Sequence, residues 1–245
     1  IIDTIGALFL GLIFLPICLI TAIAIKLDSA GPVFADTPKR VGKNNKLFKL
    51  YKFRSMVINA HKMLKNNPEF KDLYKQYKKE SYKLKEDPRV TRTGKFIRKH
   101  SLDEIPQLIN VLRGEMSLVG PRPYYPDELE NQQIKYPQTK KLVKVGLSVR
   151  PGITGAWQVS GRSEVNFDKR IEMDSWYVQR QNILDDIMIL LKSPWAMISA
   201  AEPTHVWSGS HIGRIELGQV LTSPLPESGW RLLAADREES DERRP

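Results

Sequence analysis

The sequence predicts an α/β fold that is mostly helical with a small sheet, preceded by a membrane-inserted helix. Residues 4–25 contain no charged side chain, whereas the chain beyond them is strongly basic. In that basic part, apolar residues recur at helical spacing in several segments, and only short runs alternate as strands do. At 245 residues the chain has room for one sizeable domain or two small ones.

The apolar run is long enough to cross the hydrocarbon core of a bilayer. A straight helix over residues 4–25 would be about 33 Å long, and the core is about 30 Å thick. Pro16 lies near its middle, where it removes a backbone hydrogen bond and clashes with the preceding turn. The segment therefore either crosses with a kink or bends and returns to the face it entered. A buried core helix is the alternative that its length disfavours.

Charge and cysteine content indicate the compartment of the rest of the chain. The net charge of +10, from 38 Lys and Arg against 28 Asp and Glu, predicts an anionic partner such as phospholipid, nucleotide or nucleic acid. Basic residues follow the apolar run closely, which by the positive-inside tendency places the downstream domain in the cytoplasm. Cys18 is the single cysteine, so no intrachain disulfide forms. The chain begins with Ile1 instead of Met, which leaves open whether upstream residues are missing.

Short strands and two helices are predicted in the first part of the domain. Residues 33–34 and 47–53 have strand character, and residues 42–45 between them are typical of a hairpin turn. Residues 56–85 are rich in lysine and place apolar side chains at helical spacing, which predicts two amphipathic helices broken near Pro68. Their basic faces suit either anionic lipid or water.

A further helix is predicted around residues 101–112. Ser101 is a good N-cap with Glu104 as its capping-box partner. One apolar face follows, formed by Leu102, Ile105, Leu108, Ile109 and Leu112. Pro106 conflicts with this register because a proline this deep costs a hydrogen bond, so a start nearer Pro106 is the alternative. In either case Asp103 and Glu104 sit at a helix N-terminus.

The remainder predicts a loop, a strand, one or two helices and a tail. Residues 148–155 are rich in turn formers, residues 157–159 suit a short strand, and residues 167–191 have helical periodicity in one or two pieces. Later residues are rich in Gly, Ser, Pro and charge, and we expect weak order there. The predicted parts are a membrane-inserted helix at 1–27, a domain at 28–200 and a tail at 201–245.

The densest chemistry lies between residues 95 and 123. Asp103 and Glu104 are adjacent carboxylates, and the cations that flank them are Arg98, Lys99, Arg113 and Arg122. Acids in the first turn of a helix are stabilised by its dipole and need no other role, so capping is the alternative. The flanking cations favour phosphate chemistry, in which a carboxylate near Mg²⁺ acts as a ligand or a nucleophile.

Other candidate residues are basic. Lys52 and Arg54 are predicted to share one face of a strand, with a solvated face as the alternative. Arg122 lies between two prolines that fix the backbone, and arginine suits bidentate phosphate contact. The sequence contains no GxxxxGK[ST], GxSxG, HExxH or CxxC motif, and its four histidines are scattered. It therefore predicts neither a zinc site nor a catalytic triad.

Three runs, taken together and in this order, resemble one family. They are KFRSM, DPRVTRTGKFIRKHSLDEIPQLINVLRGEMSLVGPRP and RPGITGAWQVSGRS, after an apolar helix. The chain resembles the bacterial sugar transferases, which are monotopic polyprenyl-phosphate phosphoglycosyl transferases, over roughly residues 1–195. The insertion at 57–86 is similar to that of the larger hexose-1-phosphate transferases. The resemblance implies a re-entrant first helix and a catalytic domain on the cytoplasmic face of the bacterial inner membrane.

The resemblance also implies an activity and its residues. The family transfers a sugar-1-phosphate from a UDP-sugar to undecaprenyl phosphate, releases UMP, and so starts exopolysaccharide, capsule or O-antigen (lipopolysaccharide) repeat units. The phosphosugar ester forms on the aspartate of the Asp–Glu pair, here Asp103, and Glu104 helps to hold Mg²⁺ with it. The residues that match phosphate- or substrate-binding positions are Lys52, Arg54, Arg98, Arg122 and Asp174.

The chain departs from the family's usual sequence in two places. The family's helix usually bends at a Ser-Pro pair, but Leu15 precedes Pro16, which leaves a crossing helix open. From about Ser199 onward the chain shows no resemblance to the family.

Two rival functions are open. Aromatic residues among the lysines of 70–85 suit a membrane-anchored nucleic-acid-binding protein, and a non-catalytic scaffold is the other rival. The Asp–Glu pair argues against both, so the expected partners are UDP-sugar, undecaprenyl phosphate and anionic membrane, without nucleic acid. The sugar, the pathway and a homo-oligomer are left open.

Overall fold

Helices make up most of the described chain, with two small sheets of short strands. The computed structural model describes residues 2–79, 84, 86–160 and 166–198, which lie within one compact unit, Ile1–His205. The α-helices are α1 (Ile2–Asp28), α2 (Ala60–Asn66), α3 (Lys71–Lys79), α4 (Arg92–Lys99), α5 (Gln107–Leu112), α6 (Pro126–Lys135), α7 (Lys140–Gly146), α8 (Ala156–Val159), α9 (Phe167–Arg180) and α10 (Ile183–Ile198). The strands are β1 (Arg40–Val41), β2 (Leu47–Phe48), β3 (Ser117–Val119) and β4 (Gly152–Thr154), and the 3₁₀ helices are η1 (Lys43–Asn45), η2 (Pro68–Phe70), η3 (Leu102–Glu104) and η4 (Pro137–Thr139). This confirms the predicted fold class, and the predicted tail at 201–245 lies outside the described residues.

The first sheet has its hairpin turn where one was predicted, but its first strand, β1, lies at 40–41 instead of the predicted 33–34, and the sheet is shorter than expected. β1 and β2 pair antiparallel, and η1 lies in the predicted hairpin turn between them. Of the strand predicted over 47–53, only β2 and one bridge from Phe53 to Phe34 form. Between them, the Tyr51 N–H donates to the Asn110 side chain at 2.9 Å instead of to a neighbouring strand. Long-range side-chain bonding therefore ends the strand early.

The second sheet corrects the prediction for the region after residue 147. β3 and β4 pair in parallel, so β4 lies inside the predicted loop at 148–155, and α8 replaces the strand predicted at 157–159. A Cβ on Gly152 would collide with the Gly120 backbone, which explains the glycine there. The prediction was wrong because pairing with a distant strand leaves no local periodicity to find.

The helix predicted over 101–112 begins later than its first candidate start. Pro106 is the N-cap residue of α5, which suits a residue without an N–H. Ser101 has a left-handed φ of 54° and makes no capping bond, so the predicted capping box is wrong. Asp103 and Glu104 lie in η3, immediately before α5. The alternative start near Pro106 is therefore the correct one.

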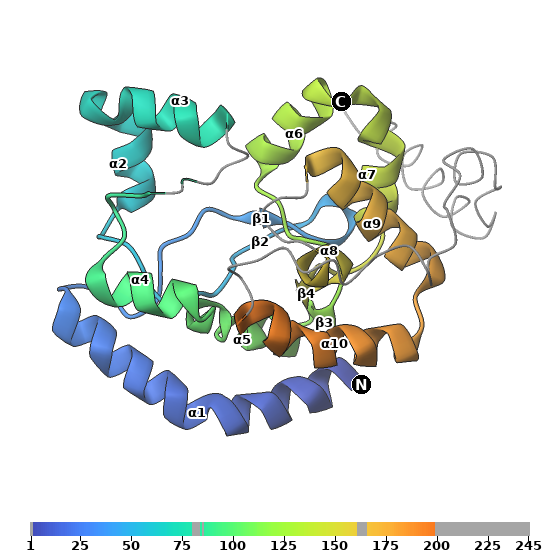
Figure 1. Cartoon of the computed structure of the whole chain (residues 1–245), viewed down its shortest axis with the longest axis horizontal. Helices are drawn as coiled ribbons and strands as arrows, with labels where there is room; N and C mark the ends of the chain where they lie inside the picture. The colour runs from blue at the N-terminus through green and yellow to red at the C-terminus, as the bar shows by residue number, and fades with distance from the viewer. Residues whose placement is uncertain (1, 80–83, 85, 161–165, 199–245) are drawn as a thin grey trace, which may run out of the picture. The chain divides into compact units, whose positions relative to one another are not determined.

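The other helical predictions are confirmed. The lysine-rich segment breaks at Asn67 and Pro68, where the Asn67 side chain accepts from the Glu69 N–H at 3.1 Å and caps η2. Residues 167–191 form two pieces, α9 and the first part of α10. Figure 1 places α2 and α3 on the far side of the unit from α1. Their lysines therefore lie away from the apolar helix.

Both ends of α1 are attached to the same domain. At its start, the Asp3 carboxylate pairs with Arg150 at 2.9 Å and accepts a hydrogen bond from the Leu118 N–H at 3.0 Å. Just beyond its end, the Arg54 guanidinium donates to the Ser29 carbonyl at 2.7 Å. A 27-residue helix is about 40 Å long. A helix that crossed a bilayer away from the domain would carry one end far from it, so this geometry favours a helix that lies along the domain.

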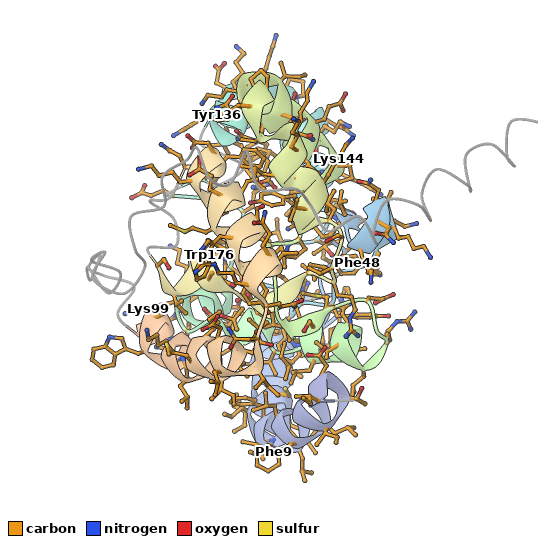
Figure 2. The ribbon with its side chains drawn as sticks, turned by 90° about the vertical axis from the view of Figure 1, so that its right-hand side faces the viewer. Phe9, Phe48, Lys99, Tyr136, Lys144 and Trp176 are labelled. Atoms are coloured by element: carbon orange, nitrogen blue, oxygen red, sulfur yellow. The ribbon has the colours of Figure 1, made fainter. Side chains whose placement is uncertain are left out.

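The face of α1 turned away from the domain is apolar. Among the described residues, α1 alone is long and apolar enough to cross a membrane. Figure 2 shows Phe9 projecting from α1 away from the domain, and α10, on the same side, exposes Leu184, Leu191 and Trp195. Soluble monomers rarely expose contiguous apolar patches of more than a few hundred Å². This side of the domain therefore suits a lipid environment.

The attachment of both ends predicts that α1 starts and ends on one side of the membrane. Cysteines replacing Ile2 or Lys43, each in a Cys18→Ser background with no upstream segment, should both react with an impermeant maleimide applied to the same face of the membrane. Pro16→Ala should shift labelling at position 2 toward the opposite face, because the straightened run is long enough to span. Opposite-face labelling of the position 2 cysteine with Pro16 in place would show a crossing helix.

Candidate active site

Three predicted site residues meet where the segment after β2 passes η3. The Phe53 N–H donates to the Asp103 carbonyl at 3.0 Å, which sets Lys52 beside η3. The Lys52 ammonium lies 2.6 Å from Glu104 Oε1 and 3.8 Å from Asp103 Oδ2. The structure thus brings one lysine against both members of the carboxylate pair.

The burial of this group changes its proton affinities. Asp103 is 8% exposed, and this burial raises its pKa, with Lys52 opposing the rise and Glu104 adding to it. Burial lowers the pKa of Lys52, but the carboxylates of Glu104 and Asp103 outweigh it, so the net shift is upward. Lys52 therefore stays charged at neutral pH. A poorly hydrated carboxylate beside a fixed cation is suited to attack an electrophilic phosphorus.

The other two basic residues predicted nearby are placed differently. Arg54 is buried and donates to the Ser29 carbonyl at 2.7 Å, so it closes the end of α1. Arg98, in the last turn of α4, is exposed and acts on Asp103 through its charge. Lys52 and Arg54 were predicted to share a strand face, but they contact different parts of the molecule.

A second cluster surrounds Trp157 in α8. The guanidinium of Arg122 lies 5.1 Å from the Trp157 ring centre, and that of Arg170 lies 4.8 Å from it. The backbone N–H of Arg122 donates to Asp174 Oδ2 at 3.3 Å. A guanidinium that lies over an aromatic face is held there by a cation–π interaction. Two arginines therefore lie over one buried ring beside one carboxylate.

Asp174 has an unusual proton affinity for an aspartate. It is 2% exposed, and this burial raises its pKa to about 7, although the Arg122 N–H and the charges of Arg170 and Arg122 lower it. The sequence identified Asp174 by resemblance but missed Arg170 and Trp157. Arg170 shares the buried face of α9 with Phe167 and Asp174. An arginine among apolar positions at helical spacing is the signal by which it could have been found.

Arg40 and Glu128 extend the charged region toward α6. The Arg40 guanidinium lies 3.2 Å above the Tyr125 ring centre and 3.9 Å from Glu128 Oε2, and both charged groups are buried. The charge of Arg40 acts on Lys52, and that of Glu128 acts on Arg122. From the sequence, Arg40 counted only as one of the basic residues that place the domain relative to the membrane, and Glu128 was not identified.

The residues present fit a metal that arrives with a substrate. Mg²⁺ is usually bound by one or two carboxylates together with water and substrate phosphates, and Asp103 with Glu104 offers that donor set. Within residues 2–79, 84, 86–160 and 166–198, no three or more His, Cys, Asp or Glu side chains gather as a metal site.

Asp174 predicts that stability depends on pH. Its folded-state pKa of about 7 exceeds the ordinary value of 3.8, so the folded chain keeps a proton that the unfolded chain releases. The contribution of Asp174 to the free energy of unfolding is greatest below about pH 4. It declines by about 1.4 kcal/mol per pH unit as the pH rises to about 7. In detergent, the urea midpoint of the unaltered chain should fall over this range relative to Asp174→Asn, which cannot titrate. Parallel curves for the two chains would contradict the raised pKa.

Comparison with known proteins adds independent information. The family model described as bacterial sugar transferase matches residues 1–200. The chain is 44% identical over 191 residues to the UDP-galactose-lipid carrier transferase of Erwinia amylovora, covering 78% of this chain and 38% of that protein. It is 50% identical over 155 residues to the undecaprenyl-phosphate galactose phosphotransferase of Salmonella typhimurium, covering 63% of this chain and 31% of that protein.

A shorter relative matches over most of its length. The exopolysaccharide production protein ExoY of Rhizobium meliloti is 40% identical over 195 residues, which cover 78% of this chain and 81% of that protein. The chain thus spans well under half the length of the first two relatives and most of the third. Since the family model matches residues 1–200, the chain belongs to the bacterial sugar transferase family.

Proposed function

We propose that the chain transfers a sugar-1-phosphate from a UDP-sugar to undecaprenyl phosphate and releases UMP. The observation that carries this proposal is the buried Asp103 beside Glu104 and Lys52, in a domain with one apolar side. Relatives named as an undecaprenyl-phosphate galactose phosphotransferase and an exopolysaccharide production protein support it. In this proposal the reaction starts an exopolysaccharide, capsule or O-antigen unit.

In the first step, an Asp103 carboxylate oxygen attacks the phosphorus that carries the sugar. The bond from that phosphorus to the oxygen it shares with UMP breaks, UMP leaves with the electron pair, and a sugar-phosphate ester remains on Asp103. The Lys52 ammonium, 3.8 Å from Asp103 Oδ2, offsets the repulsion between the attacking carboxylate and the negative phosphate oxygens that approach it. Its place is fixed before substrate binds, because the same ammonium is already held by Glu104 at 2.6 Å.

In the second step, undecaprenyl phosphate releases the sugar phosphate from Asp103. A terminal phosphate oxygen of the lipid attacks the same phosphorus, and the bond from phosphorus to the Asp103 oxygen breaks. The product is a lipid-linked sugar diphosphate, and the carboxylate is restored. Arg122, which lies over the Trp157 ring, supplies a guanidinium of the kind that binds phosphate in a bidentate manner.

Asp103 and Glu104 are the residues that would hold Mg²⁺. When bound, the ion supplies positive charge at the phosphate oxygens and lowers the barrier to phosphoryl transfer. The Glu104 side chain is 32% exposed, so it is accessible to a cation that enters from solvent with the nucleotide.

We place the domain on the cytoplasmic face of the bacterial inner membrane, with α1 inserted and returning to that face. The attachment of Asp3 and of the Ser29 carbonyl to one domain supports a returning helix. The net charge of +10 suits a surface of anionic phospholipid. This location brings the phosphate of a membrane-bound acceptor to the level of η3.

Replacing the nucleophile tests the covalent step. Asp103→Asn keeps the side-chain shape but removes the attacking anion, so transfer should fall on the order of 10³-fold or more. Intact-mass measurement after addition of a UDP-sugar should show a sugar-phosphate adduct on the unaltered chain and none on the variant. Thermal unfolding in the same detergent checks that the variant is folded. An adduct of equal mass on Asp103→Asn would place the nucleophile elsewhere.

Replacing Glu104 tests the metal. Glu104→Gln removes a charged ligand, so half-saturation by Mg²⁺ should require a concentration at least about ten-fold higher. Glu130→Gln, at an exposed position away from the site, is the matched control and should titrate like the unaltered chain. A chelator should stop transfer reversibly. Full transfer in excess chelator would remove Mg²⁺ from the proposal.

A further inference from the structure

Residues 57–86, here called the insert, have a small apolar core of their own. Helices α2 and α3 supply its two buried side chains, Leu64 and Tyr77. The partly buried side chains packed against them are Phe70, Leu73, Tyr74, Leu84 and Tyr125. Of the described members of this cluster, Tyr125 alone comes from outside the insert, and the His61 ring of α2 also stacks on it, with ring centres 6.3 Å apart. The insert therefore closes around a tyrosine that lies at the N-cap position of α6.

Arg89 fixes the insert where it leaves and rejoins the domain. Its guanidinium donates to the carbonyl of Ala60, the first residue of α2, at 2.9 Å. It also pairs with Asp87 at 2.7 Å, and the Arg89 backbone carbonyl accepts from the Val57 N–H at 2.9 Å. Because Arg89 is buried, these contacts are shielded from water. The insert is therefore a fixed support for whatever packs against it.

The apolar side chains of the insert face inward. Between residues 60 and 79, none of the large apolar side chains is exposed. Insertion into lipid uses exposed apolar side chains, of the kind that α1 and α10 present. The apolar side of the insert is instead occupied by its own core and by Tyr125. The insert therefore acts on the domain itself.

Arg40, in β1, rests on the same tyrosine. Its guanidinium carbon lies 3.2 Å from the Tyr125 ring centre, its Nη1 donates to the Pro123 carbonyl at 3.4 Å, and Glu128 Oε2 lies 3.9 Å away. Arg40 is 8% exposed, and its buried Nε–H has no hydrogen-bond partner among the described residues. Buried N–H groups of native proteins are nearly always paired, so an unpaired one indicates a group that accepts from it when bound.

Arg40 belongs to the charged neighbourhood of the candidate active site. Its charge acts on Lys52. Val41, next to it in β1, donates its N–H to the Tyr124 carbonyl at 2.9 Å, which ties β1 to the segment that carries Arg122. Arg122 also has a buried Nε without a partner in the described part of the chain. Two guanidinium groups of one region therefore each have a buried donor that suits an anionic acceptor.

We propose that Arg40 binds the phosphate that leaves with the nucleotide, and that the insert holds Arg40 in position through Tyr125. The inference rests on the proposed function and adds to it a phosphate-binding residue and a role for the insert. Lys52 is paired with Asp103 and Glu104, so it serves the phosphate under attack. In phosphoryl transfer the attacking and leaving oxygens lie roughly in line on opposite sides of the phosphorus, so the leaving phosphate needs a cation of its own.

The first test measures the phosphate contact by binding. Arg40→Gln alone would leave Glu128 buried without its cation, so Arg40→Gln is combined with Glu128→Gln, which removes both charges. Calorimetry in detergent should show UMP binding about ten-fold weaker in the double variant and uridine binding unchanged. Glu128→Gln alone keeps Arg40 and should bind UMP at least as tightly as the unaltered chain. Equal UMP affinity in the single and double variants, or an equal loss for uridine, would overturn the phosphate contact.

The second test concerns Tyr125. Tyr125→Leu removes the ring beneath Arg40 and should raise the KM for UDP-sugar about ten-fold while the KM for undecaprenyl phosphate stays unchanged. Tyr125→Phe keeps the ring and should keep both KM values. Tyr74→Leu makes the same ring-to-leucine change in the same cluster, where the cation over the ring is Lys78, and should also keep both values. An equal rise in Tyr125→Leu and Tyr74→Leu would reduce Tyr125 to a packing residue and overturn its positioning role.

The third test concerns the insert alone. Leu64 is 1% exposed in its core, so Leu64→Ala opens a cavity there without altering Arg40 or Tyr125. UMP affinity should fall several-fold with uridine affinity unchanged, and the volume-conserving Leu64→Met should retain UMP affinity. Unchanged UMP affinity in Leu64→Ala would overturn the role of the insert. If no UDP-sugar supports UMP release, the proposed function fails, while UMP binding still decides the role of Arg40.

Discussion

The candidate site depends on holding Asp103 out of water without leaving its charge uncompensated. Breaking a buried ion pair costs up to about 3–5 kcal/mol, so the backbone must place Lys52 and Asp103 together. The bond from the Phe53 N–H to the Asp103 carbonyl, at 3.0 Å, does this by fixing the segment after β2 against η3. The late start of α5 after Pro106 fits the same requirement, because η3 can then turn both acids toward the lysine.

Three consecutive residues join this chemistry to the membrane helix. Lys52 faces the carboxylate pair, Phe53 lines an apolar groove against α1, and Arg54 donates to the carbonyl of Ser29 just beyond α1. Because all three belong to one extended segment, a displacement of the end of α1 would also displace Lys52. The charged site and the apolar side of the domain are therefore connected through one backbone segment. This explains why Arg54, a basic residue of the motif, binds the end of α1 instead of the carboxylates.

The sequence predicts the parts of this arrangement that follow from local patterns. The break at Pro68 follows from proline geometry, and the helical character of 167–191 follows from apolar periodicity, which left open whether it forms one helix or two. The strand β4 could not be predicted in this way, because it exists through pairing with distant β3. Arg170 was missed for a related reason, since its importance shows only once Trp157 is seen beneath it. Arg54 is the converse case, a motif residue whose contacts no local pattern encodes.

Charge balance bears on how a phosphate ester is received. The described cations around the site, apart from exposed Arg98, are Lys52, Arg40, Arg122 and Arg170, and the carboxylates among them are Asp103, Glu104, Glu128 and Asp174. These eight charges cancel, and Arg98 together with the protonated fraction of Asp174, whose pKa is about 7, leaves a small positive excess. A diphosphate brings more negative charge than this excess offsets. A divalent cation carried in by the nucleotide would restore the balance, with the Asp103 and Glu104 carboxylates as its proposed ligands.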